Sequence, residues 1–422
     1  MSLSYEFQHR VKTLSGHHSL EQLPKELHDL GVTRPLVISD EMLKKIGILQ
    51  MVLDVLEKEG EKEIPCFTGV PVDSSSDVVN EIGRVYRKLG CDGLVAVGGG
   101  SVIDTAKGVK MLLSQEANDL LELVGCETIK RGIKIPFVVI PTTSGTGSEA
   151  TLVAVIKHVS KKVKMEFISY HLQPDVAILD SRMTKTLPPK ITASTGMDTL
   201  CHAIEAYTCL QKNPISDAYA TAAIVLIRDN LYKAVVNGNN KKVRLAMANA
   251  STMAGAAFSN SMVGLVHAIG HALGGECHIP HGDAMNILLP YVMRYNQSIL
   301  DEQYGELLIY FAGADVYAVT PKQERGKRMI QEVRKLQKRL HHCCGLPLTL
   351  GEIHPDPIDF ELVARKAMND GAILVNPKKA EKKDIIHILE AAYGKEDAQI
   401  NRIGIISRKI LEIADGKKGG RL

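Results

Sequence analysis

Acidic and imidazole side chains recur at helical spacing in the middle of this chain. Asp198 and His202 lie four positions apart, so a helix places them on one face. His267 and His271 repeat that spacing further along, and His281 follows them. A carboxylate and imidazoles that face one another can share a cation, and ligands without thiolate suit Fe(II), Zn(II), Mn(II), Co(II) or Ni(II). The spacing therefore predicts a divalent metal centre and leaves the metal open.

A structural role is the alternative for each of these histidines, because a single histidine is more often hydrogen-bonded than a metal ligand. Here, however, the histidines stand in apolar segments rich in small residues, such as residues 264–271. Charges that would balance them are not nearby, and unpaired polar groups are costly in apolar surroundings. A shared cation explains the set better than several separate structural roles.

A glycine-rich turn stands between an apolar run, residues 94–97, and a helical pattern that begins at residue 102. The turn consists of Gly98, Gly99, Gly100 and Ser101. Backbone without Cβ atoms can approach a phosphate closely, and the N–H groups and dipole of the following helix favour its negative charge. We expect a pyrophosphate site here, and a plain tight turn is the alternative.

Asp40 follows the apolar run at residues 36–39. At the end of a strand its carboxylate can accept hydrogen bonds from ribose hydroxyls and repel a 2′-phosphate, which favours NAD over NADP. Asp40 can equally cap a helix that begins at Glu41. Its position before the glycine turn also departs from the ordinary dinucleotide fingerprint, in which the acid follows the glycines.

A second polar loop, Pro-Thr-Thr-Ser-Gly-Thr-Gly-Ser at residues 141–148, follows another apolar run. It includes Thr142 and Thr143, and its hydroxyls can hydrogen-bond a nucleotide. Loops of this kind at the carboxyl end of a strand often line ligand crevices, and a polar surface loop is the alternative.

Hydrophobic patterning indicates the elements that must position these residues. In the first half, short apolar runs alternate with helical patterns, which predicts parallel strands joined by helical crossovers. The runs are residues 36–39, 94–97, 136–140 and 176–179. After residues 187–189 the apolar spacing is helical. We predict an α/β dinucleotide-binding domain with a parallel, Rossmann-like sheet over residues 1–187, and an all-α metal- and substrate-binding domain over 188–422.

Composition fits this division and excludes some partners. A chain of 422 residues with 45% apolar and 23% charged residues favours two globular domains. A net charge of +3 with scattered basic residues argues against a nucleic-acid partner. The N-terminus has no signal-peptide pattern, and the polar residues within 248–275 indicate a buried helix pair rather than a membrane span, so we expect a cytoplasmic protein without membrane contact. Eight cysteines without a CxxC pair predict reduced, mostly structural thiols.

Four segments, in this order along the chain, resemble the iron-containing (group III) alcohol dehydrogenases. They are GGGSVIDTAK at 98–107, PTTSGTGSE at 141–149, GMDTLCHAIEAY at 196–207 and GLVHAIGH at 264–271. The resemblance runs from about residue 34 to residues 376–377 and the helix after them, and the tail past about Gly394 lies outside it. It implies a two-domain architecture like that of dehydroquinate synthase.

The resemblance also implies roles for single residues. The metal ligands would be Asp198, His202, His267 and His281, and His271 would lie near the nicotinamide and relay a proton. The NAD-binding positions would be Asp40, Gly98, Gly99, Gly100, Ser101, Thr142, Thr143, Thr151, Lys164 and His271. Iron is the family's usual metal, with zinc, manganese or nickel as alternatives. Residues 69–76 depart from the family, which often has Asn-Pro there.

The function that the resemblance implies is hydride transfer between a primary alcohol or diol, or its aldehyde, and NAD, with a divalent metal polarising the substrate oxygen. The partners are then a small-molecule substrate and further copies of the chain, because family members often form homo-oligomers. The alternatives are a glycerol dehydrogenase-like enzyme, a sugar-phosphate cyclase of the dehydroquinate synthase kind, or a non-catalytic scaffold of the same fold. A cyclase needs clustered basic residues for a phosphate, and no dense set surrounds the ligand motifs; a scaffold would have lost ligands, and none is missing.

Overall fold

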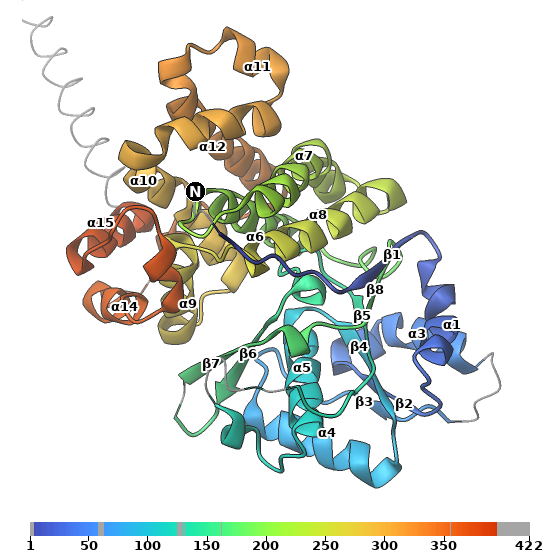
Figure 1. Ribbon diagram of the computed structural model, residues 1–422. Coiled ribbons are helices and arrows are strands. Elements are labelled where there is room, and N and C mark those ends of the chain that lie inside the picture. The colour runs from blue at the N-terminus through green and yellow to red at the C-terminus, as the bar shows by residue number, and fades with distance from the viewer. Residues whose placement is uncertain are drawn as a thin grey trace, which may run out of the picture.

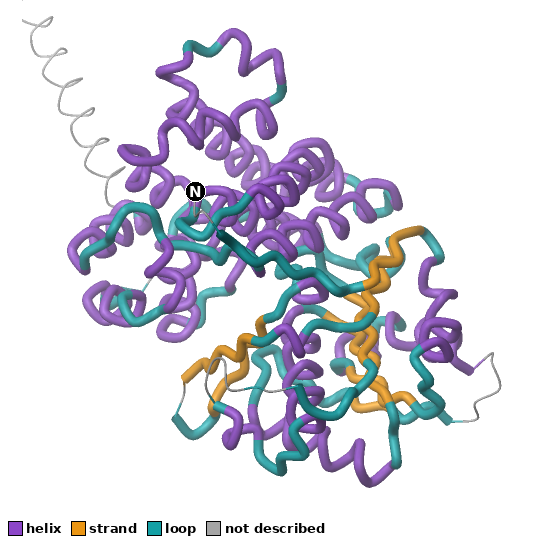
Figure 2. Tube along the Cα trace, viewed as in Figure 1, coloured by secondary structure: helices purple, strands orange, loops and turns teal. Residues whose placement is uncertain are grey.

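The computed structural model describes residues 4–57, 63–124, 129, 131–161, 163–354 and 356–394. Over these residues the chain folds into an α/β part and a helical part that lie against each other (Figure 1). Figure 2 shows the strands confined to the first part. Among the described helices, none combines the length and hydrophobicity that a membrane span requires. The tail past Gly394, which the resemblance leaves unmatched, lies outside the described residues.

A six-stranded parallel sheet organises the α/β part, in the strand order β1-β8-β5-β4-β2-β3. Its strands are β1 (Lys12–Gly16), β2 (Pro35–Ile38), β3 (Cys66–Phe67), β4 (Gly93–Gly98), β5 (Phe137–Pro141) and β8 (Val176–Asp180). Every residue of β2, β4, β5 and β8 is buried, as expected of parallel strands covered on both faces. These are the four apolar runs that predict strands, so the prediction of a parallel sheet is confirmed.

Helices cover the two faces of this sheet. They are α1 (Leu23–Asp29), α2 (Glu41–Lys45), α3 (Ile48–Glu57), α4 (Ser76–Leu89) and α5 (Gly100–Ser114). Apolar residues of α1, α2 and α3 join one hydrophobic cluster with the sheet, and those of α4 and α5 join another. The helix α5 follows β4 directly, which places the glycine turn at the carboxyl end of a central strand.

An antiparallel hairpin of β6 (Val153–His158) and β7 (Val163–Ile168) stands apart from the sheet. Its buried residues pack against α5, where a Cβ on Gly108 would come within 2.6 Å of the Ile156 Cδ1 atom. The sequence analysis did not identify this hairpin. The strand β6 begins with the apolar residues 153–156, but β7 alternates apolar with polar residues and forms no apolar run.

The helical part begins with α6 and contains no strand among its described residues. Its helices are α6 (Pro189–Thr208), α7 (Pro214–Val236), α8 (Lys241–Ser259), α9 (Leu265–Cys277), α10 (His281–Ala312), α11 (Ala314–Val319), α12 (Arg325–Cys344), α13 (Leu350–Ile353), α14 (Phe360–Ala367) and α15 (Lys382–Tyr393). The helix α6 is buried almost all round because α7, α8 and α10 pack on it. The prediction of an all-α second half is therefore confirmed as far as residue 394, where the described part of the chain ends, and the predicted buried pair corresponds to α8 and α9.

The boundary that we propose at residue 188 falls where α6 begins, at Pro189. The N-terminal segment nevertheless crosses to the helical part. The Gln8 N–H donates to Asn260 Oδ1 at 2.7 Å, and the Phe7 ring stacks on Tyr219 with centroids 5.6 Å apart. The division into 1–187 and 188–422 stays a proposal, with this segment lying on the second part.

The two parts approach each other closely at two glycines. The Gly147 N–H, at a φ of 61°, donates to the Ser251 hydroxyl of α8 at 3.1 Å. A Cβ on Gly255 would come within 2.5 Å of the Gly147 carbonyl oxygen and 3.0 Å of its Cα. Because these neighbours are backbone atoms, they cannot turn aside as a flexible side chain would. The contact therefore requires glycine on both sides.

We expect Gly255→Ala to lower the free energy of unfolding by about 1–3 kcal/mol, the usual cost of overpacking. Thermal unfolding followed by circular dichroism measures this effect. Gly275→Ala is the matched control, because Gly275 is also helical and a Cβ there meets nothing within 4 Å. A Gly255→Ala protein as stable as the Gly275→Ala protein would contradict the close approach.

Candidate metal and cofactor site

The four predicted metal ligands meet where α6, α9 and α10 converge. Asp198 Oδ1 lies 3.8 Å from His202 Nδ1, 3.8 Å from His267 Nε2 and 3.3 Å from His281 Nε2. All four ligand atoms lie within 4.8 Å of one another. Helical spacing in α6 brings the first two together, and His281 is the first residue of α10. The structure thus gathers the predicted ligands into one cluster.

The unpaired atoms of this ligand cluster fit a divalent cation. Asp198 Oδ1, His202 Nδ1 and His267 Nε2 are buried, and no described residue forms a hydrogen bond with them. Buried polar atoms are otherwise almost always paired. A carboxylate oxygen and imidazole nitrogens that face one another without partners therefore favour a shared cation.

The protonation of the imidazoles suits the same role. Burial lowers the pKa of His202 to about 3 and holds the pKa of His267 well below its ordinary value. A metal binds the neutral form of imidazole, so no proton has to be displaced from these two rings at neutral pH.

Glu205 supports the ligand cluster through the ring nitrogen of His267 that does not face the other ligands. It lies three positions after His202 on α6, and its carboxylate is 2.6 Å from His267 Nδ1. The same carboxylate accepts the Gly264 N–H at 2.9 Å and the Val266 N–H at 2.7 Å. Burial raises the pKa of Glu205 to about 7, and the two backbone N–H groups oppose that rise. The bond at Nδ1 holds the His267 ring with Nε2 toward the other ligands. Sequence reasoning missed Glu205, although its helical spacing from His202 was a usable signal.

A cleft of about 570 Å³ joins the ligand cluster to the α/β part. Its helical wall includes His202, His267, His271, His281 and Asp370, and its other wall includes Gly100, Ser101, Thr151, Lys164 and Glu166. The strand β7, which the sequence analysis did not identify, provides Lys164 and Glu166. The volume suits a small ligand. The glycine turn and the ligand cluster therefore open onto one cleft.

His271 faces two acidic residues in this cleft. Its Nδ1 lies 2.8 Å from Asp370 Oδ2 and 4.0 Å from Glu166 Oε1. Burial would lower the pKa of His271, but the hydrogen bond with Asp370 outweighs burial and holds the pKa above its ordinary value. The His271 ring also stacks on His281, with centroids 5.5 Å apart. Asp370 was not predicted, because no local spacing connects it with His271.

The glycine turn has the geometry that a phosphate site requires. Gly99 is the N-cap of α5 and offers no side-chain cap. A Cβ on Gly98 would come within 2.4 Å of the Val102 side chain, and one on Gly100 within 2.8 Å of Thr146. Glycine thus lets α5 pack on β4 while its N-terminus stays open to an anion.

Only some of the remaining predicted cofactor residues line the cleft. Lys164 lines it beside Asp73, with Nζ 3.6 Å from Oδ1. Thr142 is buried, and Thr143 lies beside Gly99, where a Cβ would come within 3.2 Å of its hydroxyl. The cleft lining does not include Asp40, Gly98, Gly99, Thr142 or Thr143.

Two predicted cofactor residues also have structural partners. Asp40 caps α2, since its Oδ1 accepts the Leu43 N–H at 2.8 Å. The Thr151 hydroxyl accepts a hydrogen bond at 2.7 Å from Lys107 Nζ, which is fully buried. Burial lowers the pKa of Lys107 to about 8. The capping alternative for Asp40 is therefore realised through Oδ1.

Known proteins resemble this chain over most of its length. The family model described as "Iron-containing alcohol dehydrogenase" matches residues 11–181, and "Fe-containing alcohol dehydrogenase family, C-terminal" matches residues 192–393. Long-chain-alcohol dehydrogenase 1 of Geobacillus thermodenitrificans is 36% identical over 383 residues, covering 90% of this chain and 94% of that protein. The NAD-dependent methanol dehydrogenase of Bacillus methanolicus is 33% identical over 377 residues, covering 89% and 97%. A crystal structure of 1,3-propanediol oxidoreductase superposes with a TM-score of 0.87 at 33% identity, over 92% of this chain and all of that one.

Proposed function

The chain belongs to the iron-containing alcohol dehydrogenase family, and we propose that the ligand cluster and the adjoining cleft carry out its reaction. That reaction is NAD-linked oxidoreduction of an alcohol or diol. The observation that carries the proposal is the meeting of Asp198, His202, His267 and His281 with unpaired ligand atoms. These four residues would hold a divalent metal, which in this family is typically iron. Zinc, manganese or nickel would fit the same donors.

The chain's own residues prepare the site for hydride transfer. When bound, the metal supplies positive charge that stabilises the substrate oxygen, and NAD supplies the hydride acceptor. Asp198 contributes the negative charge among the ligands, and Glu205 orients His267. The glycine turn would hold the pyrophosphate at the N-terminus of α5. The two walls of the cleft exclude water from the reacting atoms.

His271 is the residue that we assign to proton transfer. Its Nδ1 is engaged by Asp370, which leaves Nε2 to give or take a proton at the cleft. Oxidation of an alcohol releases a proton and reduction of an aldehyde consumes one, so a residue of this kind serves both directions. The hydrogen bond with Asp370 both holds the His271 ring in place and raises the pKa of His271.

A primary alcohol or diol is the substrate class that we propose, with the corresponding aldehyde in the reverse direction. The named relatives act on such compounds, which favours this class over the chemistry of a sugar-phosphate cyclase. A cytoplasmic location and a homo-oligomeric state are further parts of the proposal. Size-exclusion chromatography with light scattering measures the oligomeric state.

The test of the proposed function is metal-dependent NADH formation from a panel of short alcohols and diols. Protein is purified without oxygen, stripped with a chelator and reloaded with Fe(II), Zn(II), Mn(II) or Ni(II). We expect at least one metal to restore turnover of at least one alcohol. Absence of metal-dependent turnover on every alcohol would overturn the proposal and favour the scaffold or the cyclase.

We expect Asp40→Ser to shift the cofactor preference toward NADP. Serine can keep the cap of α2 but removes the carboxylate, and like charges about 4 Å apart repel by roughly 1–4 kcal/mol at protein surfaces. The ratio of kcat/KM for NAD to that for NADP should therefore fall by roughly tenfold or more.

Asp359→Ser is the control for this change, because Asp359 also caps a helix, with its Oδ1 accepting the Leu362 N–H at 3.0 Å. It should leave the cofactor ratio unchanged. An unchanged ratio in Asp40→Ser would assign Asp40 to capping alone.

A further inference from the structure

Helix α9, which carries His267, has no cap of its own. Its N-cap residue is Gly264, which offers no side chain. Side chains from other elements bind the first backbone N–H groups instead. Glu205 of α6 accepts two of them, and Asn376 Oδ1 accepts the Leu265 N–H at 3.4 Å. The start of α9 is thus defined by two side chains outside the helix.

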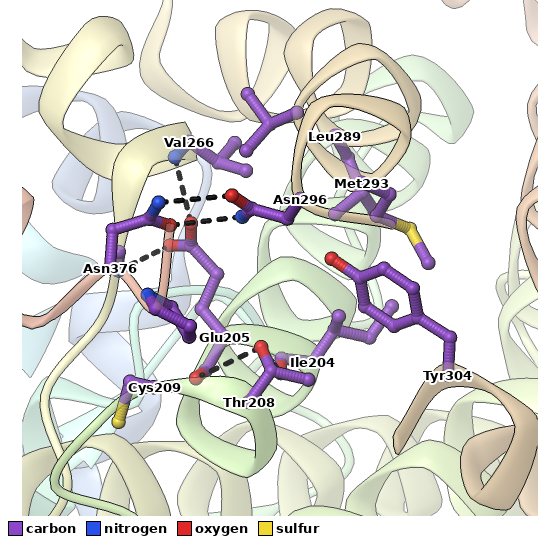
Figure 3. A pocket seen from close by; sticks show the side chains of 13 residues that line it. Ile204, Glu205, Thr208, Cys209, Val266, Leu289, Met293, Asn296, Tyr304 and Asn376 are labelled. Carbon is purple, nitrogen blue, oxygen red and sulfur yellow. Dashed lines mark hydrogen bonds between the residues drawn. The ribbon is translucent and has the colours of Figure 1, made fainter. Parts of the chain in front are cut away.

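Asn376 is itself held by a reciprocal amide pair. Asn296 Nδ2, from α10, donates to Asn376 Oδ1 at 2.9 Å, and Asn376 Nδ2 donates to Asn296 Oδ1 at 3.0 Å. Asn376 Nδ2 also donates to the Lys378 carbonyl at 2.6 Å. Figure 3 shows the two amides facing each other, with Glu205 reaching the Val266 N–H beside them. Both asparagines are buried, so it is costly to leave one of their amide groups without its hydrogen bond.

The surroundings of this amide pair are tightly packed. A Cβ on Gly264 would come within 3.0 Å of Glu205 Oε1 and 3.2 Å of Asn376 Oδ1, so any other residue there would crowd both oxygens at the start of α9. The cavity that Glu205, Asn296 and Asn376 line has a volume of about 10 Å³, far too small for a substrate. The amide pair therefore acts on the protein itself, through the position of the α9 start.

We propose that Asn376, held by Asn296, is a positioning residue for the metal ligand His267. His267 lies in the first turn of α9, so a shift of the helix start moves its Nε2 away from Asp198 and the other ligands. Asn376 accepts the Leu265 N–H, whereas Glu205 of α6 accepts the Gly264 and Val266 N–H groups, so Asn376 is a second support from a different segment of the chain. The inference rests on the proposed metal site.

The experiment compares Asn376→Ala, Asn296→Ala and the double variant with Asn286→Ala. Asn286 is a matched control, because it is fully buried on the same helix as Asn296 and also makes two amide hydrogen bonds, to the Pro347 carbonyl at 2.7 Å and from Gln337 at 3.3 Å. Zn(II) affinity of the chelator-stripped protein is measured by competition with a coloured chelator. The visible spectrum of the Co(II)-loaded protein reports the coordination geometry.

We expect Asn376→Ala to weaken Zn(II) affinity by about 10- to 100-fold, the range for outer supports of metal ligands, and to change the Co(II) spectrum. Asn296→Ala keeps the bond to Leu265 and should cause a smaller loss. The double variant should match Asn376→Ala alone, because both residues act through one contact. Asn286→Ala should bind Zn(II) as the wild type does, even where it unfolds at a lower temperature.

Unchanged affinity in Asn376→Ala, or an equal loss in Asn286→Ala, would overturn the inference. If Asn376→Ala does not fold, Asn296→Ala decides by the same criterion. A wild-type protein that binds Zn(II) no better than His267→Ala would instead remove the proposed metal site, so the two failures are distinguishable.

Discussion

His267→Ala should lower both metal affinity and metal-dependent NADH formation by at least about 100-fold. Changing a residue that only supports a metal ligand costs up to about 100-fold, and losing the ligand itself should cost at least as much. The substitution removes one of the four proposed ligand atoms, the buried His267 Nε2, and leaves three for the metal. It also leaves the Glu205 carboxylate buried without the imidazole it contacts at 2.6 Å. Metal content after dialysis and initial rates of NADH formation measure the two effects.

His342→Ala is the control for a lost histidine, because His342 is exposed on α12 and belongs to neither the ligand cluster nor the cleft lining. It should keep the metal and the activity of the wild type. Circular dichroism of the metal-free proteins separates lost binding from lost folding. Full activity of a folded His267→Ala protein would remove this residue from the metal site.

Glu205→Gln should weaken metal affinity by about 10- to 100-fold although all four ligands remain. The carboxylate accepts hydrogen bonds from Gly264 and Val266 and contacts His267 Nδ1, so a glutamine must turn its NH₂ group toward at least one donor. One buried donor then lacks an acceptor. The free energy of unfolding of the metal-free protein should fall by about 1–3 kcal/mol in addition. Chelator competition and denaturant unfolding measure the two effects separately.

Glu149→Gln is the matched control, because Glu149 is another buried carboxylate and accepts the Thr252 hydroxyl at 2.6 Å outside the ligand cluster. We expect it to bind metal as the wild type does. If Glu205→Gln also retains wild-type affinity, the contact with His267 serves folding and not the metal.

Local spacing made much of the site predictable. Asp198 and His202 share a helix face wherever that helix packs in the fold, because they are four positions apart. The same holds for His267 and His271. The central strands were predictable for a similar reason, since a strand buried on both faces, such as β4, must be apolar throughout. The glycine turn between β4 and α5 followed from its neighbours in the chain.

Contacts between distant segments were not predictable. Asp370 meets His271 across 99 positions, and Glu166 reaches the same ring from the hairpin of β6 and β7. The hairpin of β6 and β7 was not predicted, because its alternate residues are buried only through packing on α5. Nothing in the sequence around Asn376 indicates that its amide caps a helix that begins at residue 265.

The role of Asp40 was only partly predictable from the sequence. The sequence left helix capping and ribose binding as equal alternatives, because an aspartate at the end of a strand can serve either role. The structure shows that Oδ1 caps α2, and the Asp40→Ser experiment tests what the other oxygen does.

The sequence by itself determined the order of the α/β part and the helical part and the family to which the chain belongs, because these depend on residue types and patterns within single elements. The resemblance to that family then selected the four predicted ligands from the candidates that spacing left open. Only the tertiary structure decided that the ligands meet unpaired in one cluster and open onto the cleft of the glycine turn. It also decided that Glu205 contacts His267, that Asp370 contacts His271 and that Asn376 reaches the start of α9. The physical reason is that a hydrogen bond between segments about 60 to 110 positions apart depends on how whole helices pack, and no local pattern encodes that packing.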